Sequence, residues 1–321
     1  MTKNRPRLPF TCLWAILILL SGGVGALPYI SWLGAGWTPR LQAFQPWALI
    51  AVAVVVMFAL IRRRWLIAAI VAVLLIAGVV PNLAMPSKQQ TPAADTGARI
   101  TVFSFNALKA GADSKELARN IKTANPDVLV LVETSESLHD RLRAQGALVS
   151  LKYRSSQVAT GGERDTVVFS RYPLKERDVA LGPQATDWYG MPVVDIASPL
   201  GDFTVVGVHV YPPLGSATRW GTGLDALKQF LNQQTGKPVI LAGDYNSTRT
   251  HPQFRKLSSV MDEEPSLFPL STWPADRNVP PLVGIDHVLS RGFDPLAQET
   301  LHIQGSDHLA IKATLGLVAG E

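Results

Sequence analysis

Side chains that can bind metal ions or move protons recur at the ends of short apolar segments after residue 98. They stand at the ends of six such segments: Asn106, Glu133, His209, Asp244 with Asn246, Asp286, and Asp307 with His308. A packed apolar strand holds its terminal side chain precisely at the rim of a sheet. The recurrence therefore predicts one site, assembled at one rim from residues far apart in the sequence.

The carboxylate and amide oxygens in this set suit a hard cation. Mg²⁺ takes oxygen ligands in near-octahedral geometry and keeps several waters, so one or two carboxylates with amide support are enough. Glu133 is the best single ligand candidate, Asn106 offers a neutral carbonyl oxygen, and Asp307 offers another oxygen. The ion, Mg²⁺ or alternatively Mn²⁺, would polarise a phosphoryl oxygen. Zinc is disfavoured because the sequence offers neither cysteine ligands nor a close pair of histidines.

The remaining polar residues suit acid–base chemistry. A neutral imidazole at His308, oriented by a carboxylate such as Asp286, can act as a general acid or base near neutral pH. Asp244 and Asn246 stand at alternate positions, which would place them on one face of an extended segment. We expect this carboxylate–amide pair to align a water molecule for attack.

The segments that carry these residues alternate between strand and helix patterns. A proline–glycine turn at 199–202 predicts a hairpin, and the mixture as a whole predicts an α/β or α+β layered domain. Helices are predicted at 114–124, capped by Ser114, and at 224–234. The predicted strands are 99–105, 127–132, 165–170, 193–197, 203–208, 238–242, 284–290 and 308–315.

The first ninety residues have a different character and predict membrane helices. Three apolar stretches, at about 10–30, 43–61 and 65–82, can each supply the roughly 20 residues that cross a ~30 Å hydrocarbon layer. Five tryptophans lie near the expected ends of these stretches, as interfacial aromatic residues do: Trp14, Trp32, Trp37, Trp47 and Trp65. A buried soluble bundle is the alternative, but such helices carry polar faces. Residues 83–98 are rich in Pro, Ala and polar residues and are expected to be a linker to the domain at 99–317.

Basic residues predict the orientation of these helices. Lys3, Arg5 and Arg7 precede the first stretch and Arg62–Arg64 separate the second from the third, whereas only Arg40 lies between the first and second. The positive-inside rule then places the N-terminus and Arg62–Arg64 in the cytoplasm. We expect a multi-pass protein of the inner (cell) membrane whose domain lies outside the cytoplasm. If the first stretch is a cleaved signal peptide, the later topology is the same.

The charge of residues 91–321 argues against binding of duplex nucleic acid along a basic surface. The 321 residues include 30 Lys and Arg and 25 Asp and Glu. Residues 1–90 hold eight of the basic residues and none of the acidic ones, so residues 91–321 carry 22 basic against 25 acidic side chains, a net charge of −3. Tight, salt-sensitive duplex binding is therefore not supported. The single cysteine, Cys12, rules out a disulfide framework.

Six motifs together resemble the endonuclease/exonuclease/phosphatase superfamily and follow its order over about residues 99–317. They are FSFNAL at 103–108, PDVLVLVE at 126–133, VH at 208–209, LAGDYN at 241–246, GIDHVL at 284–289 and GSDH at 305–308. The resemblance implies a four-layered α/β sandwich and Mg²⁺-dependent hydrolysis of a phosphoester without a covalent intermediate.

The resemblance also implies a role for each residue. Glu133 would be the principal metal ligand, supported by Asn106, with Asp307 near the ion. Asp244 and Asn246 would position or activate the attacking water. His308, oriented by Asp286, would contact the phosphate as base or electrostatic stabiliser, and His209 would contact phosphate or protonate the leaving group. Tyr211, a phosphate-contacting phenol or a wall, and Trp273 are the candidate substrate-binding residues.

The sequence thus predicts a membrane-anchored, metal-dependent phosphohydrolase, with a phosphodiesterase of endonuclease-like type favoured. Because tethering concentrates lipid head groups around the domain, a phospholipid or sphingomyelin-type substrate competes with nucleic acid. A non-catalytic phosphate-binding or sensing module is the alternative of another class. A transporter is disfavoured because the apolar stretches hold almost no interior polar residue. The lipid bilayer and a phosphoester are the expected partners, and the sequence indicates no protein partner.

Overall fold

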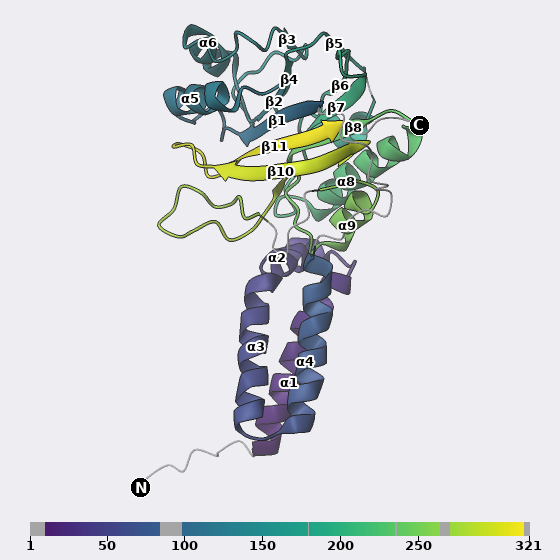
Figure 1. Ribbon diagram of the computed structural model, residues 1–321. Coiled ribbons are helices and arrows are strands. Elements are labelled where there is room, and N and C mark those ends of the chain that lie inside the picture. The colour runs from purple at the N-terminus through teal and green to yellow at the C-terminus, as the bar shows by residue number, and fades with distance from the viewer. Residues whose placement is uncertain (1–9, 84–97, 179, 235, 264–269, 318–321) are drawn as a thin grey trace.

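The computed structural model describes residues 10–83, 98–178, 180–234, 236–263 and 270–317. A bundle of long helices carries a mixed α/β domain at one end (Figure 1). The predicted linker, residues 83–98, falls almost wholly outside the described residues, as do Lys3, Arg5 and Arg7. The two described parts are nevertheless in direct contact, because side chains of each hydrogen-bond to the other.

The bundle consists of α1 (Phe10–Ala26), α3 (Gln45–Ile61) and α4 (Trp65–Val79), none of which contains a charged residue. Two spans, Cys12–Tyr29 and Trp65–Asn82, are long and apolar enough to cross a membrane. α3 supplies a third if it is counted with the preceding helical segment, from which a 62° bend separates it. The shorter pieces beside the domain are η1 (Leu27–Tyr29), η2 (Gly34–Gly36), α2 (Trp37–Ala43) and η3 (Val80–Asn82).

Glycines allow the bundle helices to approach one another closely. A Cβ atom added to Gly25 would lie 2.6 Å from the backbone oxygen of Leu74, and one added to Gly78 would lie 2.7 Å from Cδ2 of Leu49. Small residues at such contacts are typical of helices that pack without a hydrophobic driving force between them.

The α/β domain contains two mixed sheets. The strand order is β10-β11-β1-β2-β4-β3 in one and β5-β6-β7-β8-β9 in the other. The strands are β1 (Arg99–Asn106), β2 (Val128–Val132), β3 (Tyr153–Arg154), β4 (Thr166–Ser170), β5 (Leu174–Glu176), β6 (Val193–Ile196), β7 (Phe203–His209), β8 (Val239–Asp244), β9 (Asp286–Arg291), β10 (Phe293–Leu301) and β11 (Ala310–Leu317).

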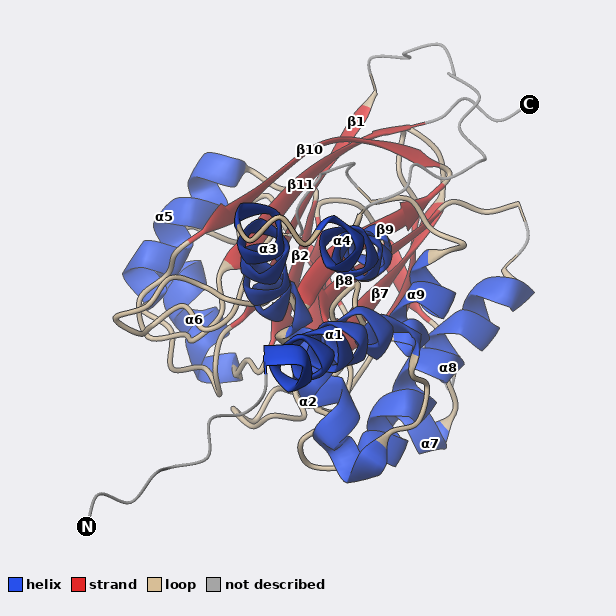
Figure 2. Ribbon diagram, turned by 90° about the horizontal axis from the view of Figure 1, so that it is seen from below, coloured by secondary structure: helices blue, strands red, loops and turns tan. Residues whose placement is uncertain are grey.

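Helices cover the outer faces of the two sheets, which makes four layers (Figure 2). α5 and α6 pack on the first sheet, and α8 and α9 pack on the second. The predicted four-layered α/β sandwich is therefore confirmed. The helices are α5 (Ser114–Ala124), α6 (Glu136–Ala144), α7 (Pro183–Thr186), α8 (Ala217–Gln233) and α9 (Pro252–Ser258).

Side chains along each central strand alternate between two cores. In β1, Phe103 and Phe105 pack beneath α5 and α6, whereas Ile100 and Val102 face the second sheet. Both faces are buried, which explains why these strands appear in the sequence as nearly continuous apolar runs.

The two predicted helices form, with corrections at their starts. The cap of α5 is Asp113 rather than Ser114, because the Asp113 carboxylate accepts a hydrogen bond from the Glu116 N–H at 2.8 Å. The helix predicted at 224–234 begins seven residues earlier, at Ala217. Glycines at 221 and 223, which lower helix propensity, hid its first turns.

The edge strand β10 is not among the predicted strands. Pro295 interrupts its alternating pattern, and the pairing with β11 shifts register between Pro295 and Ala297. Proline in a sheet is confined to edges and bulges, so a pattern-based prediction discards such a segment.

Candidate active site

The predicted site residues meet at one edge of the domain, where β1, β2, β7 and β8 end and β9 begins. His209, Asp244 and Asp286 are paired neighbours across β7, β8 and β9. Neighbouring strands lie about 4.8 Å apart. Strand register alone therefore sets these three side chains in a row.

Alternation turns this row toward the space between the sheets. Asp244 continues the face of β8 that carries Ile240 and Ala242, both of which lie in the core between the sheets. Asn106 ends the corresponding face of β1. His287, one residue beyond Asp286, instead contacts residues on the outer face of its sheet.

Asn106 connects the two sheets at the site. Its Nδ2 donates hydrogen bonds to Glu133 Oε1 and to Asp244 Oδ2, both at 3.1 Å. Its Oδ1 accepts a hydrogen bond from the Leu108 N–H at 3.0 Å. In this orientation the amide holds two buried carboxylates together, and the predicted ligation of an ion by its oxygen stays a prediction.

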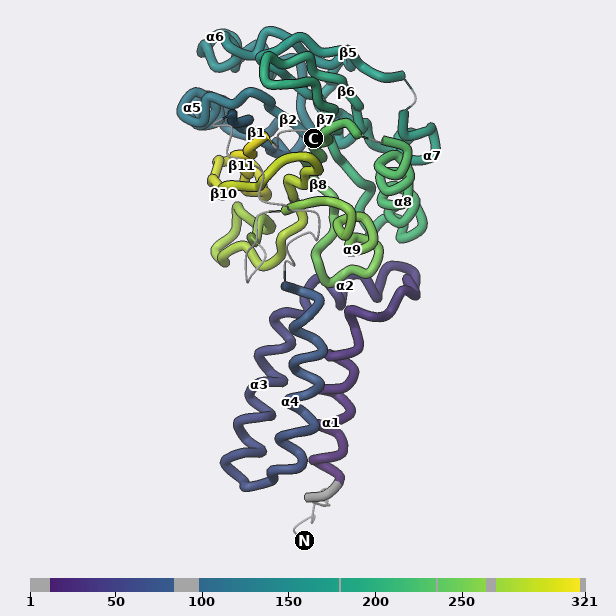
Figure 3. Tube along the Cα trace, turned by 45° about the vertical axis from the view of Figure 1, so that its right-hand side comes forward, coloured from purple at the N-terminus to yellow at the C-terminus, as the bar shows by residue number. Residues whose placement is uncertain are grey.

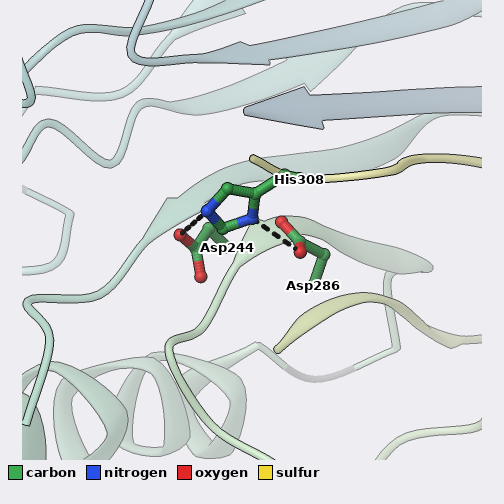
Figure 4. Close-up of side chains that lie close together, drawn as sticks. All are labelled: Asp244, Asp286 and His308. Atoms are coloured by element: carbon green, nitrogen blue, oxygen red, sulfur yellow. Dashed lines mark hydrogen bonds and ion pairs between the residues drawn. The ribbon is translucent and has the colours of Figure 1, made fainter. Parts of the chain in front are cut away.

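His308 lies between two carboxylates (Figure 4). Its Nδ1 is 2.9 Å from Asp286 Oδ2, and its Nε2 is 3.8 Å from Asp244 Oδ2. Asp307 Oδ1 also lies 3.8 Å from Nε2. Asp286 thus fixes the ring from one side and directs Nε2 toward the carboxylates on the other.

Asp244 and Asn246 come together through a turn and not along an extended segment, which corrects the sequence-based expectation. Asn246 has φ of 47°, a left-handed conformation. Its backbone N–H donates to Asp244 Oδ1 at 2.8 Å, and its Nδ2 donates to Val210 O at 2.9 Å and to Asp244 Oδ2 at 3.4 Å. Asparagine tolerates this conformation better than most residues, so the residue type matches the turn.

Glu133 also has a left-handed backbone, with φ of 52°. A conformation of this kind in a residue other than glycine costs of order 1 kcal/mol and persists where surrounding contacts hold it. The Lys109 N–H donates to Glu133 Oε2 at 3.1 Å and provides one such contact. Strain of this kind clusters at functional sites.

The electrostatics reflect several acidic groups that are buried close together. Burial raises the pKa of Glu133. Burial and the neighbouring Asp286 raise the pKa of Asp244 to about 8. Burial would lower the pKa of His308, but Asp286 and Asp244 outweigh it and raise this pKa to about 10. His209 is the opposite case, because burial and the charge of His308 lower its pKa to about 3.

This donor set fits a divalent cation. Asp244, Asp286 and His308 each offer a ligand atom within 4.8 Å of the others, and Asn106 joins Glu133 to the same group. Within the described residues, Asp307 Oδ1 is a buried oxygen without a hydrogen-bond partner. Clustered carboxylate oxygens are the ligands that Mg²⁺ and Mn²⁺ prefer, and a bound cation would offset their mutual repulsion.

The two predicted substrate-binding residues lie at the margin of the site. The Trp273 indole N–H donates to Asp307 Oδ2 at 2.9 Å, so this tryptophan holds a site carboxylate in place. The Tyr211 ring stacks on Tyr189 with centroids 5.1 Å apart. Tyr189 in turn stacks on the buried His209 ring at 4.1 Å, with an interplanar angle of 13°.

As a loop aromatic residue, Tyr189 could be expected to line a substrate groove or simply to pack, whereas its partners had no predicted role at the site. The Tyr189 hydroxyl donates to Glu163 Oε2 at 3.0 Å, and Glu163 Oε1 pairs with Lys109 Nζ at 2.6 Å. All three residues lie outside regular strands and helices. No strand-end pattern marked them, so only the tertiary structure brings them to His209 and Glu133.

Two sheets enclosed by helices, with acid, amide and imidazole groups at the strand ends, define a phosphoesterase-type α/β sandwich. A profile of the Endonuclease/Exonuclease/phosphatase family matches residues 103–308 of the chain. The chain belongs to this family, as the motifs predicted. A comparison with curated proteins found no match.

Solved structures share the fold at low sequence identity. An endonuclease/exonuclease/phosphatase from Beutenbergia cavernae is 21% identical with a TM-score of 0.51, over 69% of this chain and 72% of that one. TDP2 of D. rerio, complexed with single strand DNA product, is 15% identical with a TM-score of 0.56, over 68% and 99%. Truncated TDP2 of Caenorhabditis elegans is 18% identical with a TM-score of 0.55, over 70% and 100%.

Proposed function

We propose that this protein is a Mg²⁺- or Mn²⁺-dependent phosphodiesterase, anchored in the inner membrane, with its catalytic domain outside the cytoplasm. The observation that carries the proposal is the joining of Glu133, Asn106 and Asp244 to the Asp286–His308 pair at one edge. Membership of the family supports phosphoester hydrolysis. TDP2 with its single strand DNA product supports a diester of the nucleic-acid kind as one substrate class.

The ion would be held by Glu133 with help from Asp307, Asp244 and Asn106, and would stabilise negative charge on the phosphoryl oxygens. The attacking water would be positioned by Asp244 together with Asn246. His308 presents Nε2 to the phosphate while Asp286 fixes the ring. Geometry of this kind contributes through orientation and through charge stabilisation in a site with little water.

The anchoring proposal rests on the apolar helices. Lipid would cover side chains that otherwise contact water, among them Leu19, Val54, Ile61, Leu66 and Val73. The N-terminal end of α1 and the Arg62–Arg64 turn lie at the end of the bundle away from the domain (Figure 3). Because basic residues favour the cytoplasmic side, this arrangement supports a domain outside the cytoplasm.

Hydrolysis of bis(p-nitrophenyl) phosphate by the full-length protein in detergent tests this proposal. We expect turnover with Mg²⁺ or Mn²⁺, none with EDTA, and a loss of at least about 100-fold in His308→Ala. p-Nitrophenyl phosphate tests whether a monoester is preferred. A folded protein that hydrolyses neither compound with any divalent ion would overturn the proposal in favour of a non-catalytic module.

A further inference from the structure

The helical bundle contacts the domain through loops at the catalytic edge. The hydrogen bonds described between the two parts involve loop residues that follow β8 or precede β9, or the first turns of α9. They are Trp47 Nε1 to Leu282 O at 2.7 Å, Thr250 Oγ1 to Asn82 Oδ1 at 2.7 Å, His251 Nε2 with Pro39 O at 2.8 Å, Gln253 Nε2 to Ser31 O at 3.1 Å, and Arg255 to Pro28 O. The bundle is therefore attached at the edge of the domain that carries the active site, and not at the opposite edge.

A chain of contacts joins the start of α3 to the site. The Trp47 indole N–H, in the first turn of α3, donates to Leu282 O. The Leu282 N–H donates to Trp273 O at 2.8 Å, and the Trp273 indole N–H donates to Asp307 Oδ2 at 2.9 Å. Three hydrogen bonds therefore separate a bundle tryptophan from a site carboxylate.

A second contact lies on the other side of the site. Gly36, with φ of 90°, is so close to the loop after β7 that an added Cβ would lie 2.6 Å from Pro213 O. Pro213 is two residues beyond Tyr211, whose ring is joined to His209 through Tyr189. One margin of the site thus rests on the first turn of α3, and the other rests on the segment that links α1 to α3.

The surface at this junction is aromatic and apolar. Four aromatic residues of the bundle there are at least 45% exposed: Tyr29 57%, Trp32 76%, Trp37 65% and Trp47 45%. Exposed aromatic rings at helix ends are typical of the membrane–water interface. The loop that carries Leu282 lies over the upper end of α3 (Figures 1 and 3) and exposes Val279 by 47%. Val279 and Pro280 thus add exposed apolar side chains beside the bundle, next to the exposed polar residues Asp276–Asn278.

We propose that the substrate is a phosphodiester in the head group of a lipid in the membrane leaflet beside the domain. This inference rests on the proposed phosphodiesterase function and membrane anchor. With the proposed anchor, the exposed aromatic rings would lie at the membrane–water interface, and both margins of the site would lie beside the lipid phosphates. The domain region, with 22 basic and 25 acidic residues, supplies no net attraction for a long polyanion.

The reaction balances with water alone. The water oxygen forms a bond to phosphorus, and the bond from phosphorus to one ester oxygen breaks. The departing oxygen ends with a proton, and the water's second proton is released or held by the site. A lipid diester and water give a phosphomonoester and an alcohol, at least one of which stays in the membrane.

Proteoliposomes carrying the full-length protein test the inference. Vesicles of phosphatidylethanolamine, phosphatidylglycerol, phosphatidylcholine and cardiolipin would be followed by mass spectrometry, with bis(p-nitrophenyl) phosphate and a single-stranded oligonucleotide in parallel. We expect lipid cleavage in vesicles that carry the protein and little in added vesicles that lack it. Hydrolysis of the soluble diester without lipid cleavage would overturn the inference and leave the proposed function intact. Loss of all hydrolysis would instead count against the proposed function.

A pair of matched variants tests the geometry. Val279→Asp places a charge in the loop beside the helices, and we expect about a tenfold loss of lipid cleavage with unchanged hydrolysis of the soluble diester. Val149→Asp is the control, because Val149 is 73% exposed in the loop after α6, away from the bundle. Equal lipid cleavage by both variants, or faster cleavage of the oligonucleotide than of lipid, would contradict the proposal.

Discussion

Thr250 donates a hydrogen bond to Asn82 at 2.7 Å across 168 residues of sequence, and both side chains are buried. Asn82 also donates to Gln45 Oε1 and to Gly78 O. The bond therefore joins a polar cluster in the helical bundle to the loop that follows Asp244. Through it the bundle is part of the structure that supports the site.

Thr250→Val is expected to destabilise the full-length protein. The substitution leaves Asn82 Oδ1 buried without its partner, which costs about 1–3 kcal/mol. Thermal unfolding in detergent measures the loss, and Thr250→Ser, which keeps the hydroxyl, serves as the control. Equal stability of the valine and serine variants would show that the bond contributes nothing.

Asp286→Asn is expected to lower kcat for bis(p-nitrophenyl) phosphate by about 100-fold or more and to leave KM nearly unchanged. The reason is that Asp286 lies 2.9 Å from His308 Nδ1 and fixes the ring. Because the two residues act as a unit, Asp286→Asn combined with His308→Gln should lose little more than His308→Gln alone. If the losses in kcat of the two single variants added up in the double variant, Asp286 and His308 would act independently, contrary to this prediction. Asp140→Asn, on the exposed side of α6, is the control.

Glu133→Gln is expected to weaken Mn²⁺ binding by at least about tenfold, measured by calorimetry on the full-length protein. The variant removes one negative charge from the donor set but keeps the shape and the hydrogen bond to Asn106. In the unmodified protein, chelation with EDTA should abolish hydrolysis, and added Mg²⁺ or Mn²⁺ should restore it. Wild-type affinity in the variant would place the ion elsewhere in the carboxylate group.

Acid should weaken the fold through Glu263. Burial would raise the pKa of Glu263, but His287 and Arg249 outweigh it and lower the pKa to about 2 from its ordinary value of 4.5. A folded-state pKa below the unfolded one stabilises the fold above about pH 4.5, and this contribution is lost as the pH falls toward 2. Glu263→Gln should remove this dependence, worth of order 3 kcal/mol. Chemical unfolding at a series of pH values measures the free energy of unfolding. If this free energy fell with pH in parallel for the unmodified protein and the Glu263→Gln variant, the role of Glu263 would be contradicted.

Cysteine labelling tests the orientation of the helices. In a Cys12→Ser background, a membrane-impermeant maleimide should label Val149→Cys in intact spheroplasts but label Arg63→Cys only after permeabilisation. The reason is that the Arg62–Arg64 turn is expected to face the cytoplasm. The reverse pattern would place the domain inside.

The sequence predicted the layered fold and the strand-end residues of the site, but it did not predict the turn at Asn246 or the long-range contacts. A polar residue at the end of an apolar strand is visible in the sequence, so Asn106, His209 and Asp244 could be predicted as site residues. The turn at Asn246 was misread as extended because spacing alone does not reveal a left-handed backbone. Tyr189 and the bundle contacts of Trp47 and Thr250 depend on long-range packing, which leaves no local pattern.

The pairing of His209 with Asp244 and of Asp244 with Asp286 has a consequence for quality control. A strand that slips by one residue turns every side chain to the opposite face, so a misaligned β8 would turn the Asp244 carboxylate toward the covering helices and away from His308. Correct alignment of β8 is thus a condition for a working centre. Turnover of a small chromogenic ester therefore also reports whether a purified sample has folded correctly.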